Sequence, residues 1–237
     1  MSDITSSSAK PSKGVRNYTL LVLVLIYASS HIDRQIVSIL AESIKQDLDL
    51  SDSQLGFLIG LSFALFYATL GIPIAMLADR YSRRNIIAAS VVIWSGMTAL
   101  SGLAGNFLQL ALARIGVGIG EAGSSPPSHS MITDLFPLES RSAAMGVYAA
   151  GINIGVLFGF LVGGWIDQWY GWRMAFFIVG VPGIFLGALM LFTVPEPTRT
   201  IAPKPWPKNF FAEIWQTFKV MLAIPSLRHI LIGCTLV

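Results

Sequence analysis

Four ionisable residues lie in stretches of the sequence that are otherwise apolar: Asp33 and Arg34 in one stretch, Arg114 and Glu121 in another. Ionisable groups in such surroundings cost about 2.5–3.5 kcal/mol each on insertion scales and usually face a partner or a water-filled cavity. Desolvation raises the pKa of a carboxyl group and a nearby guanidinium lowers it, so a moving Arg114 would load and unload a proton. We therefore interpret Asp33 and Glu121 as a proton-coupling pair.

The basic residues of this constellation have two possible roles. Arginine keeps its charge, so Arg34 and Arg114 are either charge partners of the acids or ligands of an anionic substrate headgroup. The neighbouring His31 is grouped with them. A static ion pair that fastens two helices is the alternative interpretation, but two acids and two arginines in apolar stretches favour the functional one.

The surrounding sequence has the composition of a membrane protein. Hydrophobic residues make up 54% of the chain and charged residues 12%, against about 25% charged in soluble domains. Mean hydropathy is +0.66. Crossing a bilayer takes about 20 helical residues. Six stretches qualify: Tyr18–Ala41, Leu55–Ala78, Ile86–Leu103, Phe107–Ile132, Ala143–Ile166 and Met174–Val194. The sequence therefore predicts an all-α protein with the lipid bilayer as its surroundings.

Lysine and arginine fall mainly in alternate connections, and cytoplasmic segments carry this excess. The basic connections hold Lys10, Lys13, Arg16, Arg80, Arg83, Arg84, Arg141, Arg199, Lys204, Lys208, Lys219 and Arg228. We expect a multi-pass protein of the plasma (inner) membrane with a cytoplasmic N-terminus. The net charge of +3 is explained by this asymmetry and requires no nucleic acid.

The chain divides into four segments by composition. Residues 1–16 form a cytoplasmic arm, residues 17–194 the six-helix transmembrane bundle, and residues 195–225 a cytoplasmic linker with an amphipathic helix. One face of that helix carries Phe211, Trp215, Phe218 and Leu222, which favours a place on the membrane surface; packing against the bundle is the alternative. Residues 226–237 are the start of a seventh transmembrane helix, so we expect the chain to be incomplete.

Three pairs of residues indicate an internal repeat. Asp33 and Glu121, Gly71 and Gly159, and Asp79 and Asp167 are each 88 residues apart. A unit of three helices that is duplicated inverts its second copy, and transporters are often built in this way around a central site. The sequence thus predicts two inverted three-helix repeats.

Small residues recur every fourth position in the second and fifth stretches, which allows helix backbones to approach closely. They are Gly56, Gly60, Ala64 and Ala68, and Gly151, Gly155, Gly159 and Gly163. In the fourth stretch Pro126 and Pro127 break the helical ladder and predict a flexible or unwound turn before His129, which we interpret as a structural residue.

Signals for enzyme chemistry are weak. Gly118-Ile-Gly120-Glu-Ala-Gly123 fits a dinucleotide-binding pattern, but that pattern requires a preceding strand. Ser128, His129 and Asp134 have no orienting motif around them, and no metal-ligand spacing is present. We expect no enzyme activity, no catalytic residues, no metal, and no cofactor besides protons as the coupling ion.

Several motifs resemble those of the major facilitator superfamily. Asp79-Arg80-Tyr81-Ser82-Arg83-Arg84 resembles its signature after the second helix, although Ala75 and Ser82 replace two glycines. The run from Arg114 to Gly120 resembles the fourth-helix motif. Gly155–Gly164 resembles the fifth-helix antiporter motif, with Phe160 in place of proline, and Pro195–Arg199 resembles the motif that closes the sixth helix.

Within the superfamily the chain resembles the N-terminal half of bacterial Spinster-type lipid transporters. The resemblance implies a six-helix bundle, completed by a C-terminal six-helix bundle absent from this chain, and an amphiphilic substrate such as a lysophospholipid or sphingolipid. It also implies proton coupling through Asp33 and Glu121. Organic-anion and sugar-acid symporters share the run around Glu121 and are the alternative. Cavity-facing Tyr148 and Asn153 would favour them. A membrane-embedded enzyme or sensor, or a half-chain dimer, is a weaker rival.

The charges at the cytoplasmic face suggest a gate. Oppositely charged groups there would latch the outward-open state through charge-assisted hydrogen bonds during alternating access. The candidates are Asp79, Arg80, Arg83, Arg84, Arg141, Glu196 and Arg199. Retention of arginine inside the cell is the simpler explanation, but it does not account for the acid Asp79.

Overall fold

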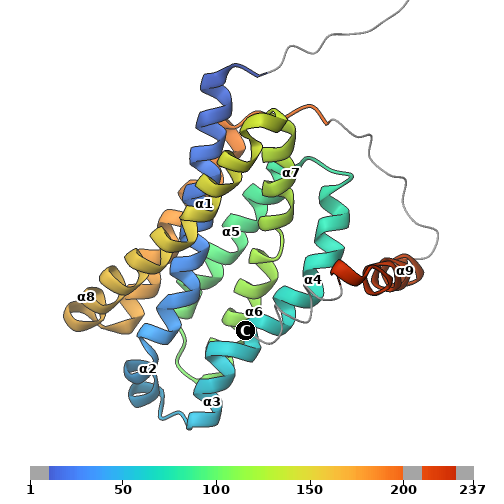
Figure 1. Cartoon of the computed structure of the whole chain (residues 1–237). Helices are drawn as coiled ribbons and strands as arrows, with labels where there is room; N and C mark the ends of the chain where they lie inside the picture. Colours follow the sequence, from blue (N-terminus) through green and yellow to red (C-terminus); the bar gives the residue numbers. More distant parts are fainter. Residues whose placement is uncertain (1–10, 200–209, 228–237) are drawn as a thin grey trace, which may run out of the picture. The chain divides into compact units, whose positions relative to one another are not determined.

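The computed structural model describes residues 11–199 and 210–227, and the regular elements in these ranges are all helices. Figure 1 shows the long helices side by side in a bundle, with α8 running down the bundle and back. The elements are α1 (Lys13–Ile39), α2 (Ala41–Leu48), α3 (Asp52–Gly56), the π-helical turn η1 (Phe57–Leu61), α4 (Ser62–Ala78), α5 (Arg83–Ser101), α6 (Phe107–Glu121), α7 (Ser125–Leu135), α8 (Leu138–Thr193) and α9 (Phe210–Ala223).

Three of the helical segments are long and apolar enough to cross a membrane by length and hydropathy: Lys13–Ile39, Asp52–Ala78 and Leu138–Thr193. The last of these holds the fifth and sixth predicted spans. Its backbone leaves helical geometry at Gly171, where φ is +78° and ψ is 164°. Only glycine adopts this conformation readily, so Gly171 is where the chain reverses direction.

The fourth predicted span is divided into two helices. α6 ends at Glu121 and α7 begins at Ser125, with Pro126 in the first turn of α7. Proline is tolerated there because the first backbone N–H groups of a helix have no partner within the helix. The turn that the two prolines predict therefore lies directly after the buried acid Glu121.

The glycines of the fifth span face α1. A Cβ atom on Gly151 would lie 3.0 Å from the carbonyl oxygen of Val24, and one on Gly163 would lie 2.7 Å from Ile36 Cδ1. In the same way Gly118 of α6 packs on the backbone of Phe63 in α4. The first span thus packs on the fifth and the second on the fourth, as expected for two inverted repeats.

The small residues of the second span do not follow this pattern. No atom lies within 4 Å of the Cβ position of Gly56 or Gly60 among the described residues. Ala64 and Ala68 are exposed. The interpretation of this stripe as a packing surface is therefore wrong within the described bundle, because the stripe faces outward.

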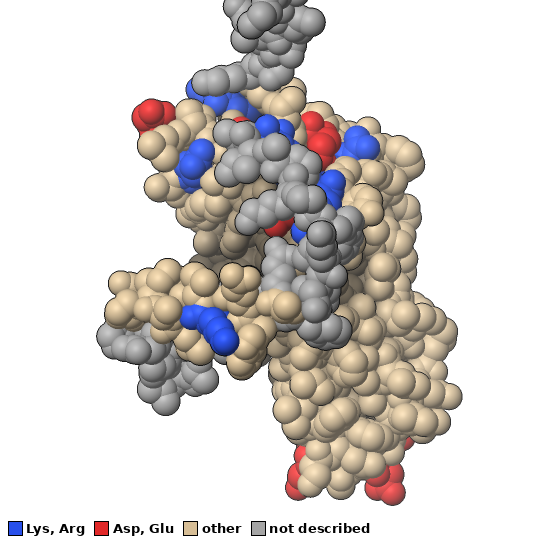
Figure 2. Space-filling view, turned by 90° about the vertical axis from the view of Figure 1, so that its right-hand side faces the viewer, with Lys and Arg blue, Asp and Glu red and all other residues tan. Residues whose placement is uncertain are grey.

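On the face that Figure 2 shows, charged residues gather at the two ends of the bundle, and the belt between them consists mostly of uncharged residues. We call the end where α4 stops and α5 begins the arginine-rich end, because it holds Arg80, Arg83, Arg84 and Arg199. The opposite end carries the short helix α2, where Asp47 Oδ2 accepts a hydrogen bond from Arg173 at 2.5 Å. α9 belongs to a separate unit of the chain, and residues 228–237, with the start of the predicted seventh helix, lie outside the described residues.

Candidate functional site

Three of the four ionisable residues inside the bundle are almost completely buried. The exposed fractions are 0% for Asp33 on α1 and 1% for both Arg114 and Glu121 on α6. The fourth, Arg34, keeps 28% of its side chain exposed. The bundle therefore brings together the residues that the sequence singles out, and leaves one of them open to the surroundings.

Glu121 is paired with Arg34. The Nε of Arg34 donates a hydrogen bond of 2.7 Å to Glu121 Oε2, which joins the first span to the fourth. The guanidinium carbon of Arg34 lies 4.9 Å from the ring centre of Phe63 and 4.7 Å from that of Tyr67, both on α4. Stacking on aromatic rings and charge pairing are complementary for arginine, so Arg34 is held by three helices.

Asp33 has no such partner. Neither carboxylate oxygen of Asp33 accepts a hydrogen bond from the described residues, and Nε and Nη1 of Arg114 are likewise unpaired and buried. The polar side chains that face Asp33 are Thr98 and Trp94 of α5, and their Oγ1 and Nε1 atoms also lack partners. Buried polar groups are nearly always hydrogen-bonded to protein or water, so this group of neighbouring polar atoms around Asp33 is a candidate functional site.

The predicted companion His31 lies near Arg34, and its hydrogen-bond partners belong to its own helix. Its Nδ1 lies 2.9 Å from the carbonyl oxygen of Tyr27, and its ring stands edge-on to the Tyr27 ring. Tyr27 stacks on the buried Tyr148 with ring centres 4.3 Å apart, and His129 stands edge-on to Tyr148 at 5.2 Å. These four rings form a column that supports α1, and His31 makes no ion pair with Asp33 or Glu121.

The arginine-rich end contains a buried ion-pair network centred on Arg83, which is 1% exposed. Its Nε donates to Glu196 Oε1 at 3.0 Å, and its Nη1 donates to Asp134 Oδ2 at 2.5 Å and to Ser130 Oγ at 2.9 Å. Arg83 therefore ties the start of α5 to α7 and to the segment after α8. We call this network of Arg83, Ser130, Asp134 and Glu196 the Arg83 clamp, because it holds three segments of the bundle together.

The other predicted gate residues also make contacts inside the bundle. Arg199 donates to the carbonyl oxygens of Ala78, Asp79 and Tyr81, where α4 ends. The remaining arginines make these contacts: Arg141 donates to the carbonyl of Thr133, Arg80 to that of Met76, and the backbone N–H of Arg84 to Glu196 Oε2. The side chain of Asp79 is exposed at the end of α4. A latch to a second bundle stays a prediction, with Asp79 as its most available acid.

Glu196 is an acid at the arginine-rich end whose pKa is shifted by its neighbours. Burial raises the pKa of its carboxyl group, but the Arg84 N–H, the Ser82 hydroxyl and the Arg83 guanidinium donate to it and outweigh burial. The pKa of Glu196 is therefore lowered from its ordinary value. A carboxylate held in this way stays charged and keeps Arg83 neutralised.

Sequence reasoning missed the residues that surround the charged groups. Phe63 and Tyr67 on α4 and Trp94 and Thr98 on α5 carry no charge, so nothing in an apolar stretch distinguishes them from packing residues. Asp134 follows the fourth predicted span, and its pairing with Arg83 has no signal in the sequence besides its charge. Among the described residues no group of three or more His, Cys, Asp and Glu is placed to hold a metal ion.

Comparisons with known proteins agree with this geometry. The model of the Major Facilitator Superfamily matches residues 23–237. An MFS-type efflux pump of Mycolicibacterium smegmatis is 40% identical over 173 residues, which cover 73% of this chain and 40% of the pump. A probable L-galactonate transporter of Escherichia coli is 34% identical over 182 residues, which cover 76% of this chain and 40% of that protein. The chain thus spans about 40% of the length of these curated relatives.

A solved structure is similar over most of the chain. It is the crystal structure of a bacterial homologue of the human lysosomal transporter Spinster in an inward-facing, unoccupied conformation. Its sequence is 40% identical, the TM-score is 0.78, and the match covers 91% of this chain and 51% of that one. The fold is therefore that of one half of such a transporter.

Proposed function

The chain belongs to the major facilitator superfamily, and on that basis we propose that it is the N-terminal half of a proton-coupled secondary transporter for an amphiphilic, lysophospholipid- or sphingolipid-like substrate. A second six-helix bundle would complete the transporter, consistent with the greater length of the relatives. Alternating access would arise from rocking of the two bundles around a site between them. The protein is an integral membrane protein, and we place it in the inner membrane with its N-terminus in the cytoplasm.

The observation that carries proton coupling is the contrast between two buried acids on facing helices. Glu121 is paired with Arg34, whereas Asp33 is unpaired although Arg114 is its charged neighbour. A carboxyl group that lacks a fixed partner can take up a proton without breaking a bond, and a paired one releases a proton readily. Exchange of arginine partners between the two acids would therefore couple protonation to helix movement.

The mobile element in this scheme is Arg34. Its guanidinium is the only member of the four charged groups with substantial exposure, so it is the group that a substrate reaches first. A phosphate or other anionic headgroup would compete with Glu121 for this guanidinium, since Glu121 binds it through one hydrogen bond and arginine forms charge-assisted hydrogen bonds with phosphate as well. Substrate binding would then free Glu121 to accept a proton.

The amphiphilic substrate class is supported by the similarity to the Spinster homologue and by the aromatic rings of Phe63 and Tyr67 beside Arg34. These rings offer an apolar surface next to a cation, as an amphiphile with an anionic head requires. Tyr148, which would favour a polar substrate if it faced the cavity, is instead 2% exposed and stacked on Tyr27.

A sugar-acid or organic-anion symporter is the second candidate. It is favoured by the probable L-galactonate transporter among the relatives, and by Asn153, which is exposed on α8. Both candidates use Arg34 for an anion and differ in whether an acyl chain accompanies it.

Transport into vesicles that carry the complete transporter tests the proposal. Labelled lysophospholipid and labelled galactonate are each offered with and without a pH gradient. We expect gradient-dependent movement of lysophospholipid, and expect Asp33→Asn and Glu121→Gln to remove the gradient dependence. Movement of galactonate alone would favour the second candidate.

Asp49→Asn is the matched control. Asp49 is an exposed acid outside the bundle interior, with φ of +49°, and asparagine tolerates that conformation as well as aspartate does. Its variant should transport like the original protein. Unchanged gradient dependence in both Asp33→Asn and Glu121→Gln would remove the role assigned to these acids.

A further inference from the structure

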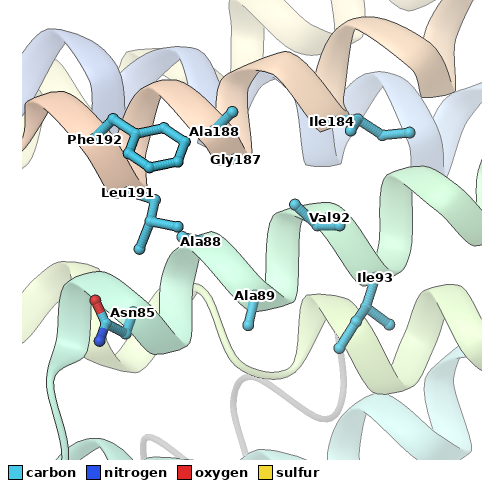
Figure 3. A pocket seen from close by; sticks show the side chains of 10 residues that line it. All are labelled: Asn85, Ala88, Ala89, Val92, Ile93, Ile184, Gly187, Ala188, Leu191 and Phe192. Atoms are coloured by element: carbon cyan, nitrogen blue, oxygen red, sulfur yellow. The ribbon is translucent and has the colours of Figure 1, made fainter.

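An apolar groove of about 410 Å³ runs along the outer surface of the bundle between α5 and the last turns of α8. It is separate from the charged site, because none of its lining residues belongs to α1, α4 or α6. Figure 3 shows Ala89 and Val92 on α5 and Ala188 and Phe192 on α8 along its two sides. Ala89 and Ala188 have small side chains and therefore leave space at the surface, and the longer side chains of Val92 and Phe192 border this space.

The length of the groove fits one leaflet of a bilayer. Its lining residues reach from Asn85 to Ile93 on α5, and from Phe192 back to Ile184 on α8. Eight residues of helix rise about 12 Å, whereas one half of a hydrocarbon core is about 15 Å thick. The groove therefore spans most of the leaflet at the arginine-rich end.

The end of the groove at the membrane surface carries a cation. Arg84 Nε donates to Asn85 Oδ1 at 3.0 Å, and Arg84 Nη1 lies 3.5 Å from the carbonyl oxygen of Val194, two residues beyond Phe192. These contacts place the guanidinium between the start of α5 and the end of α8. A guanidinium has five N–H donors, so donors remain for a phosphate. The nearby acid Glu196 shares the Arg83 guanidinium with Asp134 and also accepts hydrogen bonds from Ser82 and from the backbone N–H of Arg84.

We propose that this groove binds one acyl chain of an anionic glycerophospholipid, with the lipid phosphate on Arg84 and Asn85. The Arg84 guanidinium at one end of the groove is complementary to a lipid phosphate, and the length of the groove matches an acyl chain within one leaflet. These two properties select this occupant. A second apolar groove, of about 320 Å³ between α1 and both arms of α8, provides the comparison. Neither groove has a charged lining residue, but the first one ends at Asn85, which accepts a hydrogen bond from Arg84. The second groove therefore serves as an apolar surface without that guanidinium.

Photo-crosslinking of the full chain in nanodiscs tests the proposal. Phosphatidylglycerol and phosphatidylcholine, each with a diazirine in the acyl chain, are compared, and the labelled peptides are identified by mass spectrometry. We expect phosphatidylglycerol to label residues 85–93 and 184–192 preferentially. Arg84→Gln should reduce this labelling about tenfold, because a charge-assisted hydrogen bond is lost. Ala188→Phe should prevent labelling by both lipids, because the added ring fills the groove.

Matched controls separate the groove from general effects of charge and size. Lys13→Gln removes an exposed cation from the same end of the bundle, and Val181→Phe adds a ring to α8 at an exposed position that does not line the groove. Neither should change the labelling. Thermal melting of each variant verifies that it is folded.

Two outcomes would overturn the proposal. The first is equal labelling of the groove by both lipids with no effect of Arg84→Gln, which would show that the surface has no headgroup site. The second is displacement of the probe by soluble glycerol phosphate at the same concentration, which would show that an anion binds without its acyl chain. Failure of lysophospholipid transport leaves this proposal unaffected, because it concerns a different surface.

Discussion

Arg34 Nε and Glu121 Oε2 lie 2.7 Å apart, and this bond joins the first and fourth spans. The carboxylate is completely buried, whereas the guanidinium is 28% exposed. The pair therefore has a clear energetic asymmetry, because losing the arginine leaves a buried charge with no hydrogen bond, while losing the acid leaves a cation that water can reach.

We predict that Arg34→Gln lowers the free energy of unfolding by about 3 kcal/mol, the lower part of the range for broken buried pairs. Glu121→Gln should cost less, and the double variant should be more stable than Arg34→Gln alone because the uncompensated charge is gone. Thermal melting of the three variants in detergent measures this. Additive losses in the double variant would mean that the two side chains are not coupled.

Glycine packing on α8 gives a second prediction. Gly155 lies against the carbonyl oxygen of Ala28 and the Cβ of His31, whereas nothing lies within 4 Å of the Cβ position of Gly164 on the same helix. Gly155→Ala should destabilise the bundle by about 1–3 kcal/mol through overpacking, and Gly164→Ala should be neutral or slightly stabilising. Melting temperatures of the two variants decide the matter, and equal effects would contradict the close contact of α1 with α8.

The Arg83 clamp at the arginine-rich end gives a third prediction. Arg83→Gln removes the cation that Asp134 and Glu196 share, so we expect a loss of about 3 kcal/mol in unfolding free energy. Lys45→Gln also removes an ion pair, that with Asp52, but both groups are at the surface and we expect no measurable change. A small effect of Arg83→Gln in the same melting assay would show that the network contributes little.

Acid sensitivity is the fourth prediction. The pKa of Glu196 is lowered in the folded protein, so its contribution to stability is complete above the unfolded pKa of about 4.3 and is lost as the pH falls through the folded value. The Tm should therefore decrease on acidification below about pH 5. Glu196→Gln should lose part of this decrease. The same pH dependence in both proteins would show that other carboxyl groups account for it.

Much of the fold could be predicted because a bilayer imposes a length on each helix. Apolar runs of about 20 residues identify the six spans, and the prolines after Glu121 mark the break between α6 and α7. The short helix α2 was not predicted, since five of its eight residues are polar or charged and it is far shorter than a membrane span. The reversal between the fifth and sixth spans was predicted, but hydropathy does not show that it takes place at Gly171, within a single helical run.

The candidate site could be predicted only in part. Asp33, Arg34, Arg114 and Glu121 stand out because charges are rare in apolar runs, and all four come together. Which arginine pairs with which acid depends on the rotation of each helix about its axis, and this decides that Arg34 binds Glu121. Arg83 and Glu196 pair through opposite charges that the sequence displays. Arg80, Arg141 and Arg199 instead donate to backbone carbonyls, for which a sequence carries no signal.

Proton coupling through Asp33 is tested most directly by measuring the protons that move when substrate binds. Purified complete transporter in unbuffered detergent solution receives lysophospholipid, and a pH indicator measures protons released or taken up per substrate bound. We expect a measurable proton exchange in the original protein that is greatly reduced by Asp33→Asn and kept by Asp49→Asn. An unchanged proton count in Asp33→Asn, with substrate still bound, would contradict it.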